Sequence, residues 1–398
     1  MTTKERSLNF AFTGGITMDL QDYRKQIDDI DDQLVKLFAQ RMEVTKGIVA
    51  YKQEHGMKIL DAGREREKLA AVCAKVSPEL RNYTSVLYSS IFELSRSYQS
   101  RQMTKFTDLS RKITDAIENT PRLFPENASV AVAGVEGAYA QIATEKMFKM
   151  PFILYMNSFQ GVFAAIDSGL ARYGVVPIEN STAGSVKQVY DLMVSHNFSI
   201  VRSVRLKVDH NLLVNEGAKL EDIKEIYSHE QAISQCAGFL KSLGKDVKVI
   251  PMANTARAAE LVANSGRKDV AALSSRSCIE LYGLKCLKYS VQDQGNNYTR
   301  FLCISKNLEI YPGANHTSIM LTTAHKPGAL YKLLSRFYAL GINVTKLESR
   351  PIPDRDFEFM FYFDLETSVY SREYIQMICE LSASSEEFTY LGSYSEVI

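Results

Sequence analysis

Several cationic and amide side chains near the amino terminus are spaced so that they could bind a small anion. Arg41 interrupts an apolar helix seam, and Lys52 follows eleven residues later, about three helical turns on and on nearly the same face. A guanidinium at an apolar position is unfavourable unless an anion meets it. Ser95 and Gln99 are four residues apart and share a face of another helix. Arg24 points about 100° away from Arg41, so it could serve a neighbouring site.

A seven-residue apolar repeat predicts the long helix that carries Arg41 and Lys52, over residues Leu20–Lys52. Its two seams are Ile27, Leu34, Arg41 and Ile48, and Tyr23, Ile30, Leu37, Val44 and Tyr51. A helix of roughly 50 Å cannot fold back on itself, so it needs partner helices, which a second copy of the chain would supply. Alternatively, Arg41 extends its charged head to water and Lys52 is an ordinary surface charge.

Two shorter helices are predicted to follow. Asp61 is placed to cap a helix whose first turn contains Arg64 and Glu65, and the next helix runs from about Glu79 to Arg101. The helix dipole disfavours a cation in the first turn. Arg64 therefore indicates either an anion or a carboxylate nearby, or a solvated charge cluster around the cap.

Together these residues resemble the all-helical chorismate mutase domain over residues 18–101. The matching positions, with a two-residue deletion before the last two, are Arg24, Arg41, Lys52, Asp61, Arg64, Glu65, Ser95 and Gln99. The resemblance implies an interlocked dimer in which one arginine of each site comes from the other subunit. It also implies that the arginines hold the carboxylates of chorismate and that Lys52 and Gln99 donate to the breaking ether oxygen. Glu65 would bind the ring hydroxyl, and Asp61 and Ser95 would support the frame.

This chemistry needs oriented charge rather than a nucleophile, a metal or a cofactor. Chorismate rearranges in one pericyclic step, which is accelerated by holding the reactive conformer and stabilising charge on the ether oxygen. Because Gln99 is an amide, it should keep its donor at every pH, whereas a glutamate there would have to be protonated.

The composition bounds the other possibilities. A chain of 398 residues has room for two to four domains, and its net charge of +1 excludes an overall field that would favour nucleic acid or a membrane surface. No apolar run has membrane-spanning length. The six cysteines lack CxxC or metal-ligand spacing, which fits reduced thiols in a cytoplasm. Residues 1–18 are interpreted as a short disordered lead-in, and residues 102–127 as a polar linker.

From residue 128 the chain alternates strands and helices, which predicts an α/β domain of two lobes with a cleft between them. Polar residues follow several predicted strands, as Glu179–Thr182 do after Val175–Ile178. Each cluster alone is explained by helix capping. Jointly they indicate a ligand site, because open α/β sheets bind ligands at strand ends.

Three motifs in residues 128–305 resemble prephenate dehydratase: Val175–Asn180, Tyr227–His229 with Gln231 and Gln235, and Asn297–Phe301. The family fold is two-lobed, like a periplasmic binding protein. The resemblance implies that prephenate lies in the cleft and loses water and carbon dioxide to give phenylpyruvate. That reaction requires protonation of the departing hydroxyl and fixed carboxylates.

The resemblance also suggests individual roles. Thr299 would contact the departing hydroxyl, although a β-branched residue also simply favours a strand. Glu179 is a candidate acid, Asn180 and Gln235 would orient the ligand, and Arg300 would brace the lobes. Helix N-termini would hold the carboxylates together with the hydroxyls of Ser181, Thr182, Thr255 and Ser274. The family usually has hydroxyl residues where this chain has Ala138 and Ala140, so the preferred substrate is open at this point.

Residues 314–396 predict a third module in the order βαββαβ, an α+β ferredoxin-like fold. Two of its motifs resemble the ACT regulatory domain of prephenate dehydratases: Gly328, Ala329 and Leu330, and Glu348, Ser349, Arg350 and Pro351. In that family the motifs surround phenylalanine at a domain interface. Without the resemblance, they are a helix-start turn and ordinary surface charges.

The chain therefore resembles the bifunctional chorismate mutase/prephenate dehydratases over almost its whole length. The expected ligands are chorismate, prephenate and, as a feedback inhibitor, phenylalanine. We expect a homodimer or higher homo-oligomer and no nucleic-acid or membrane partner. Two alternatives are arogenate dehydratase activity in the middle domain and a phenylalanine sensor whose cleft is inactive.

Overall fold

The computed structural model describes residues 19–57, 59–103, 107–244, 246–352, 358–385 and 387–397. It divides the chain into two compact units, Met1–Met103 and Thr104–Ile398. The predicted lead-in of residues 1–18 lies outside the described part. No helix in the described ranges is long and apolar enough to cross a membrane.

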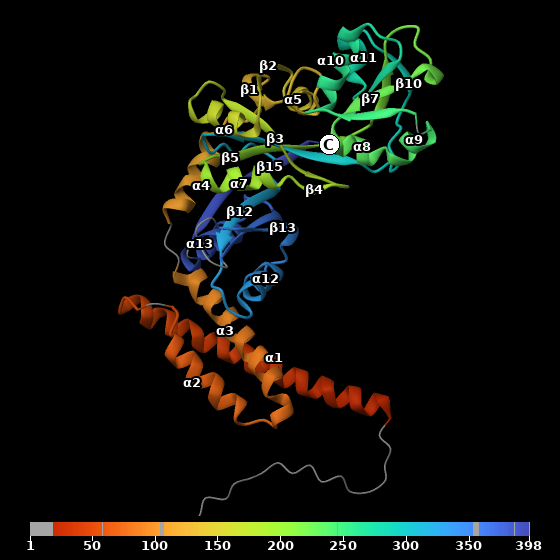
Figure 1. The fold of residues 1–398 in the computed structure, drawn as a ribbon. Helices are drawn as coiled ribbons and strands as arrows, with labels where there is room; N and C mark the ends of the chain where they lie inside the picture. Colours follow the sequence, from red (N-terminus) through yellow and green to blue (C-terminus); the bar gives the residue numbers. More distant parts are fainter. Residues whose placement is uncertain are drawn as a thin grey trace, which may run out of the picture. The chain divides into compact units, whose positions relative to one another are not determined.

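The first unit is helical, as predicted (Figure 1). Its elements are α1 (Leu20–Glu54), α2 (Ala62–Cys73), the 3-10 turn η1 (Pro78–Leu80) and α3 (Arg81–Met103). Asp19 begins α1 with a capping box, in which its side chain accepts from the backbone N–H groups of Gln21 and Asp22. Asp61 caps α2 by accepting from the backbone N–H of Arg64 at 3.0 Å, which confirms the predicted cap.

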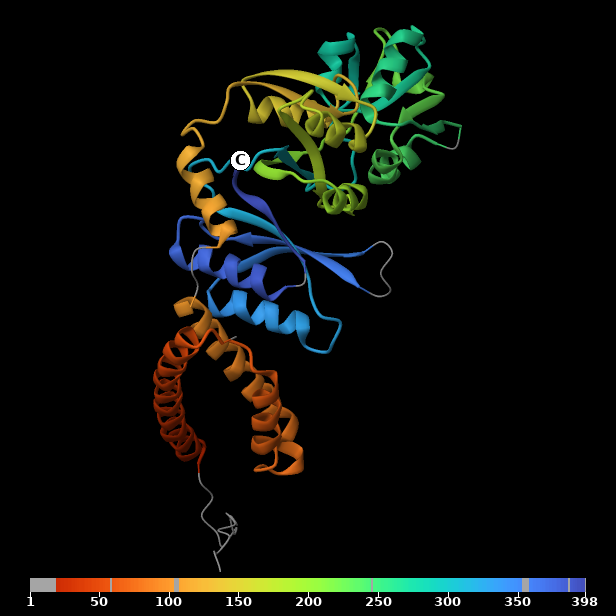
Figure 2. The ribbon, with the colours of Figure 1, turned by 90° about the vertical axis from the view of Figure 1, so that its left-hand side faces the viewer.

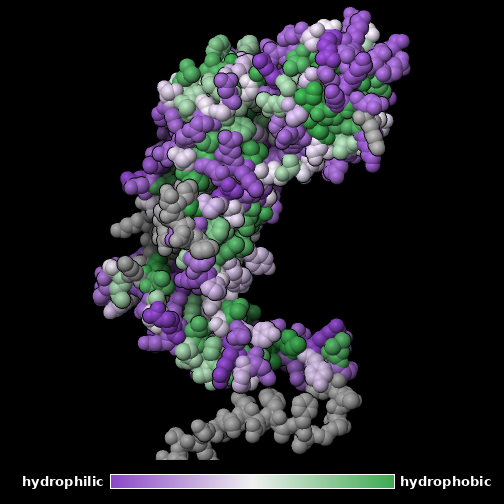
Figure 3. Space-filling view, in the orientation of Figure 1, coloured by the Kyte–Doolittle hydropathy of each residue, from purple (hydrophilic) through white to green (hydrophobic). Residues whose placement is uncertain are grey.

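The apolar seams of α1 remain largely exposed. Ile27 is 56% and Leu34 is 54% exposed, and only the later turns, at Thr45 and Val49, are buried within the unit. Hydrophobic side chains are accordingly visible on the surface of this unit (Figure 3). The single chain thus leaves the predicted helix-packing face without a partner among its described residues.

The second unit begins with a helix that the sequence analysis did not predict. Residues 102–127 were interpreted as a linker, but α4 (Asp108–Asn119) occupies the middle of this range and buries Ser110, Ile113 and Ala116. Thr107 caps it. The linker prediction is therefore wrong over this helix, which packs against α13.

The two-lobed domain follows. The first lobe contains β1 (Asn127–Ala133), α5 (Tyr139–Met147), β2 (Met150–Met156), α6 (Phe159–Asp167), β3 (Tyr173–Asn180), β4 (Gly184–Ser185), α7 (Lys187–Ser195), β5 (Ser199–Lys207) and β11 (Tyr298–Ser305). Helix α5 packs on one face of this sheet, and α6 and α7 pack on the other. The second lobe contains β6 (Asn211–Val214), η2 (Leu220–Asp222), β7 (Glu225–Ser228), α8 (Glu230–Gln235), α9 (Ala237–Ser242), β8 (Lys248–Pro251), α10 (Thr255–Ser265), β9 (Val270–Ser274), α11 (Ser277–Tyr282) and β10 (Lys285–Lys288).

The C-terminal module has the predicted βαββαβ order (Figures 1 and 2). Its elements are β12 (His316–Thr322), α12 (Ala329–Ala339), β13 (Asn343–Pro351), β14 (Phe359–Glu366), α13 (Arg372–Ser384) and β15 (Phe388–Val397). Helices α12 and α13, joined by α4, cover one face of its sheet. The opposite face packs against the first lobe through Tyr362 and Tyr190.

One sheet runs through the C-terminal module and the first lobe. Its strand order is β13-β14-β12-β15-β5-β11-β3-β1-β2, with β4 beside β3. The join is made by the end of β15, where Ser395, Glu396 and Val397 pair in parallel with Arg202, Ser203 and Val204 of β5. The second lobe has a separate sheet in the order β10-β6-β9-β7-β8.

Candidate functional site

Arg41, Lys52, Ser95 and Gln99 come together between α1 and α3 in the helical unit. The guanidinium of Arg41 donates to Ser95 Oγ, and Lys52 Nζ donates to Gln99 Oε1 at 3.3 Å. Burial lowers the pKa of Arg41 from its ordinary value, while nearby Tyr88 and Glu65 act in the opposite direction. The predicted cations and donors thus face one another, and none of these four side chains is splayed into solvent.

Glu65 reaches the same region through a residue that the sequence analysis missed. The guanidinium of Arg96 binds the carboxylates of both Glu65 and Glu93. Arg96 lies between Ser95 and Gln99 on α3. It holds the carboxylate of Glu65, which is predicted to bind the ring hydroxyl. The sequence could have indicated Arg96, because it lies between two residues of a motif that was already identified.

Three predicted residues do not join this cluster within one chain. Arg64 is exposed and lies 3.7 Å from Glu67, and Asp61 is occupied as the cap of α2. Arg24 is exposed on α1 and makes no ion pair with the described residues. In the single chain Arg24 and Arg64 both lie outside the cluster, and their expected roles remain predictions.

The cleft of the two-lobed domain lies where the chain crosses between lobes. The crossovers are residues 208–210 and 291–297, and they are tied together by hydrogen bonds from the N–H of Val208 to the carbonyl of Asn297 and from the N–H of Val291 to the carbonyl of His210, both 2.8 Å. Two cavities of about 360 and 270 Å³ adjoin here and share Gln231 and Gln235. The smaller one is lined by Thr299 and Asn180, and Ala138 and Ala140 also line it.

Asn180 determines how Thr299 is oriented. Its Oδ1 accepts from the backbone N–H groups of Thr182, at 3.0 Å, and Ala183, at 2.9 Å. Its Nδ2 therefore donates, to Thr299 Oγ1 at 2.9 Å and to Asn297 Oδ1 at 2.7 Å. Because Thr299 Oγ1 accepts this bond, its own O–H remains available to donate to a ligand in the cavity.

Gln235 links this group to a histidine that the sequence analysis missed. Its Nε2 donates to Thr182 Oγ1 at 2.6 Å, and its Oε1 accepts from Asn297 Nδ2 at 2.9 Å. The same Oε1 lies 2.9 Å from Nε2 of His210, which also lines the smaller cavity. An amide oxygen can only accept, so Nε2 of His210 carries a hydrogen. A lone histidine between two apolar strands gave no sequence signal.

The four hydroxyls predicted to hold carboxylates separate into two pairs. Thr182 lines the larger cavity, and Thr255 lines the smaller one at the start of α10. Ser181 Oγ instead donates to the carbonyl of Asn296 at 2.7 Å, and Ser274 Oγ donates to the carbonyl of Thr255 at 2.9 Å. Neither serine lines either of these two cavities, and in the described structure the hydroxyls of Ser181 and Ser274 donate to the backbone.

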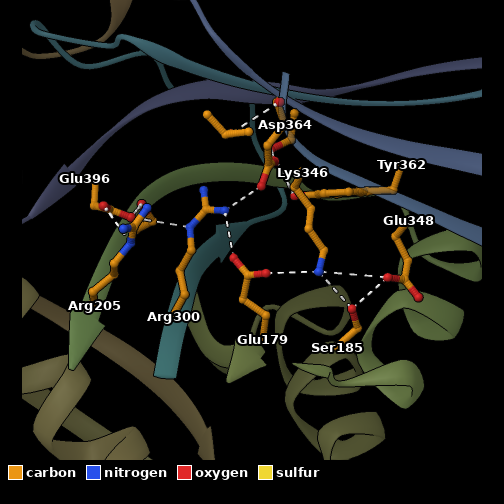
Figure 4. Close-up of polar contacts among 12 residues, drawn as sticks. Glu179, Ser185, Arg205, Arg300, Lys346, Glu348, Tyr362, Asp364 and Glu396 are labelled. Carbon is orange, nitrogen blue, oxygen red and sulfur yellow. Dashed lines mark hydrogen bonds and ion pairs between the residues drawn. The ribbon is translucent and has the colours of Figure 1, made fainter. Parts of the chain in front are cut away.

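Glu179 points away from the cleft. It pairs with Arg300 in the β3–β11 ladder, next to the pair of Asn180 and Thr299, and successive strand residues point to opposite faces. Its carboxylate lies 3.0 Å from Lys346 Nζ and 3.6 Å from Arg300 (Figure 4). This position corrects the prediction that Glu179 is the acid at the departing hydroxyl.

Arg300 is the buried centre of this charged junction. It binds Asp364 of β14 at 2.5 Å and donates to Tyr394 Oη of β15 at 2.8 Å. Glu396 lies 3.4 Å from its Nε and 3.0 Å from Arg205 (Figure 4). Arg300 therefore joins the first lobe to the C-terminal module, whereas the sequence analysis expected it to brace the two lobes.

The predicted effector motif on β13 also faces this junction. Glu348 accepts from Ser185 Oγ at 2.6 Å, and Arg350 makes a bidentate contact of 2.8 and 2.9 Å with Asp191 of α7. Ser349 and Pro351 alternate with them and are exposed. The second motif forms the start of α12: Gly328 has φ of 81° at its N-cap, followed by Ala329 and Leu330.

Two family models match separate parts of the chain. Prephenate dehydratase matches residues 130–309, and chorismate mutase type II matches residues 23–100. These ranges contain the cleft and the helical cluster described above.

Named relatives and a solved structure agree with these matches. The bifunctional chorismate mutase/prephenate dehydratase of Escherichia coli (strain K12) is 30% identical over 380 residues, 93% of this chain and 95% of that protein. Arogenate dehydratase/prephenate dehydratase 2, chloroplastic, of Arabidopsis thaliana is 35% identical over 297 residues, 72% of this chain and 76% of that protein. The crystal structure of prephenate dehydratase in complex with L-Phe from Arthrobacter aurescens has a TM-score of 0.62 at 24% identity, covering 67% of this chain and 89% of that one. This last likeness concerns the fold.

Proposed function

The chain belongs to the family of bifunctional chorismate mutase/prephenate dehydratases, and we propose that its helical unit, its two-lobed domain and its C-terminal module respectively make prephenate, consume it and respond to phenylalanine. Both enzyme activities follow from membership of the family. The assignment of residues to each step rests on the geometry.

In the helical unit, Arg41 holds a carboxylate of chorismate while Lys52 and Gln99 act on the ether oxygen. The observation that supports this is the convergence of Arg41 with Ser95 and of Lys52 with Gln99. Charged donors oriented before the reaction stabilise the transition state without reorganising. Glu65, held by Arg96, accepts from the ring hydroxyl.

The site is completed by a second copy of the chain. The apolar seams of α1 are exposed at Ile27 and Leu34, and Arg24 lies on the same helix with no ion-pair partner among the described residues. A helix of this length with an uncovered apolar face is stabilised by packing against another helix. We therefore assign the missing cation of each site to Arg24 of the other subunit in a homodimer.

In the cleft, Thr299 is the residue that contacts the departing hydroxyl of prephenate. The observation that carries this assignment is the bond from Asn180 Nδ2 to Thr299 Oγ1, which leaves the threonine O–H as a directed donor. Thr255 and the N-terminus of α10 are available for the carboxylates, whereas the hydroxyl of Thr182 already donates to Asn180 Oδ1 at 2.7 Å. Loss of carbon dioxide and water makes the ring aromatic, so the protein needs only to position the ligand and assist the hydroxyl.

The C-terminal module serves as an ACT regulatory domain for phenylalanine. Its support is the βαββαβ topology, the positions of Gly328 at a helix start and Glu348 on β13, and the ligand of the Arthrobacter aurescens structure. Feedback inhibition requires phenylalanine to bind the less active conformation more tightly than the active one. The charged junction of Lys346, Glu179 and Arg300 provides a physical connection from β13 to the catalytic strands.

Arogenate is the second candidate substrate of the cleft. It is favoured by the name of the Arabidopsis thaliana relative and by Ala138 and Ala140, which leave the cavity wall without hydroxyls at these two positions.

We place the protein in the cytoplasm because its six cysteines are free.

The test is to supply purified protein with chorismate and to follow prephenate and phenylpyruvate, with and without phenylalanine. We expect both products in sequence and inhibition of the second step. Prephenate and arogenate are then compared as direct substrates. Phenylalanine binding without any turnover would refute the enzymatic assignment and favour the sensor.

A further inference from the structure

The segment Gly134–Tyr139, called the clasp below, belongs to the first lobe in sequence but packs against the second. It leaves the first lobe at the end of β1, where the N–H of Gly134 donates to the carbonyl of Met156 at 2.9 Å, and it returns there at the start of α5. Between these points, Val135 and Ala138 pack into a hydrophobic cluster of the second lobe. The clasp therefore spans the two lobes at a place where the chain does not cross between them.

Backbone carbonyls of the clasp accept hydrogen bonds from side chains of the second lobe. The carbonyl of Gly137 accepts from Ser275 Oγ at 3.1 Å. The carbonyl of Glu136 accepts from Tyr282 Oη, at the end of α11, at 2.8 Å. The clasp is thus a noncovalent connection between the lobes, in addition to the crossovers.

The docking of the clasp requires a glycine at position 137. The φ of Gly137 is 87°, in the left-handed region, and a Cβ there would lie 2.9 Å from Cys278 Sγ and 3.0 Å from Leu281 Cδ2. Cys278 has no exposed surface, so its sulfur has little room to move in a packed core. A side chain at position 137 would therefore push the clasp away from the second lobe.

Two neighbouring serines connect the clasp to the ligand-binding end of the second lobe. Ser275 holds the carbonyl of Gly137, and the preceding Ser274 donates at 2.9 Å to the carbonyl of the first residue of α10. This residue, Thr255, lines the smaller cavity together with Thr299 of the first lobe. The clasp is therefore tied to one of the two threonines that face this cavity from opposite lobes.

We propose that Gly137 is a positioning residue of the dehydratase, because by letting the clasp dock on Ser275 it fixes the distance across the cleft between Thr299 and the start of α10. A ligand whose hydroxyl contacts Thr299 and whose carboxylate contacts α10 must span this distance. Lobes joined by crossovers alone can change their separation by hinge bending. A displacement of about 1 Å between groups that hold a reacting ligand can cost about a hundredfold in rate. The inference rests on the dehydratase activity assigned above.

Gly137→Ala tests the docking, and Gly169→Ala is its matched control. Gly169 also has a positive φ, of 75°, but an added Cβ would meet no neighbouring atom within 4 Å, so this variant carries the backbone strain alone. We expect Gly137→Ala to lose about a hundredfold in dehydratase kcat/KM, through both a higher KM and a lower kcat, and Gly169→Ala to stay within about threefold of the parent. Urea unfolding followed by circular dichroism checks that each protein is folded, and its mutase rate checks the concentration.

Gly137→Cys provides a reversible form of the same test. Since a Cβ at this position lies 2.9 Å from Cys278 Sγ, the new cysteine can form a disulfide with Cys278 that fastens the clasp to the second lobe. The disulfide is detected as the loss of a pair of titratable thiols, which reports the docking without any turnover. We expect the oxidised protein to have a dehydratase kcat/KM at least about tenfold above that of its reduced form, in which the side chain displaces the clasp. The parent, treated with the same oxidant and reductant, is the control for the native thiols.

Three results would overturn the proposal. They are a folded Gly137→Ala protein whose dehydratase kcat/KM lies within about threefold of that of Gly169→Ala, a Gly137→Cys protein that forms no disulfide, and an oxidised Gly137→Cys protein no more active than its reduced form. A parent that turned over neither prephenate nor arogenate would instead refute the assigned reaction. The disulfide would still report the docking in that case, so the two failures are distinguishable.

Discussion

Lys346 Nζ lies 3.0 Å from the carboxylate of Glu179, so a cation of the C-terminal module is bound to the strand residue beside Asn180. Glu179 and Asn180 belong to one strand and point to its opposite faces. One short segment of β3 thus contacts the C-terminal module on one side and orients Thr299 on the other.

Replacing Lys346 with methionine tests whether this contact matters for catalysis. Loss of the ion pair should raise the KM for prephenate about tenfold, or roughly 1.4 kcal/mol, and weaken inhibition by phenylalanine, while the mutase rate stays constant. The matched control is Lys149→Met, at an exposed lysine 3.5 Å from Glu126. Unchanged dehydratase kinetics and inhibition in Lys346→Met would limit the junction to a packing role.

Asp364→Asn should destabilise the second unit. Asp364 has no exposed surface and binds Arg300, so the substitution leaves a buried guanidinium without its main counter-charge. The expected loss in free energy of unfolding is about 3 kcal/mol, measured by urea unfolding followed through dehydratase activity and circular dichroism. Glu126→Gln, at an exposed carboxylate, should leave the urea midpoint unchanged. Equal midpoints for all three proteins would contradict the importance of this ion pair.

Thr299 can be tested with a pair of variants. Thr299→Ala removes the donor and should lower dehydratase kcat about a hundredfold or more, whereas Thr299→Ser keeps the hydroxyl and should retain much of the activity. Steady-state assays on prephenate measure both. If the alanine protein dehydrated prephenate at the parental rate, the hydroxyl would have no part in the reaction.

The amide of Gln99 leads to a prediction about how the mutase rate depends on pH. An amide keeps its donor, so turnover of chorismate by the parent should not fall between neutral and mildly alkaline pH. Gln99→Glu should be active only where its carboxyl is protonated, so its rate should rise as the pH is lowered. A sharp alkaline loss in the folded parent, with circular dichroism unchanged, would exclude Gln99 as the essential donor.

Mixed dimers test the contribution of Arg24 across the subunit interface. Arg24→Ala and Arg41→Ala should each lose most mutase activity alone. When the two are co-expressed, half of the dimers are mixed and one of their two sites is intact, so about one quarter of the parental rate should return. Dehydratase activity provides the internal standard for concentration. No recovery in verified mixed dimers would place both arginines in the same chain's site.

The helical unit was predictable because its signals are periodic. The heptads over Leu20–Lys52 gave α1 to within two residues of its observed end at Glu54. Helix α4 was missed although Leu109, Ile113 and Ile117 are spaced four apart, because the surrounding polar residues were given more weight. Arg64 was placed in the site by its position in the motif, but its side chain faces solvent at the start of α2.

The cleft was predictable in part. The motif residues Asn180 and Gln235 do converge with Thr299, as expected. The alternation of strand faces already implied that Glu179 could not share the cleft with its neighbour Asn180. His210 was not predictable, since its role depends on the crossover between lobes and on a bond to a residue twenty-five positions later.

The three residue pairs between β15 and β5 restrict how the proposed inhibition by phenylalanine can operate. A module attached by a flexible tether can move away as a rigid body, but here the ladder continues from the strands of the C-terminal module into those of the first lobe. The proposed regulation would then act through a small change in the twist of this continuous sheet, or through separation of the paired ends of β15 and β5. Deleting the module to obtain an enzyme insensitive to phenylalanine would also remove the strand that pairs with β5. The unpaired edge of β5 would then be prone to aggregation.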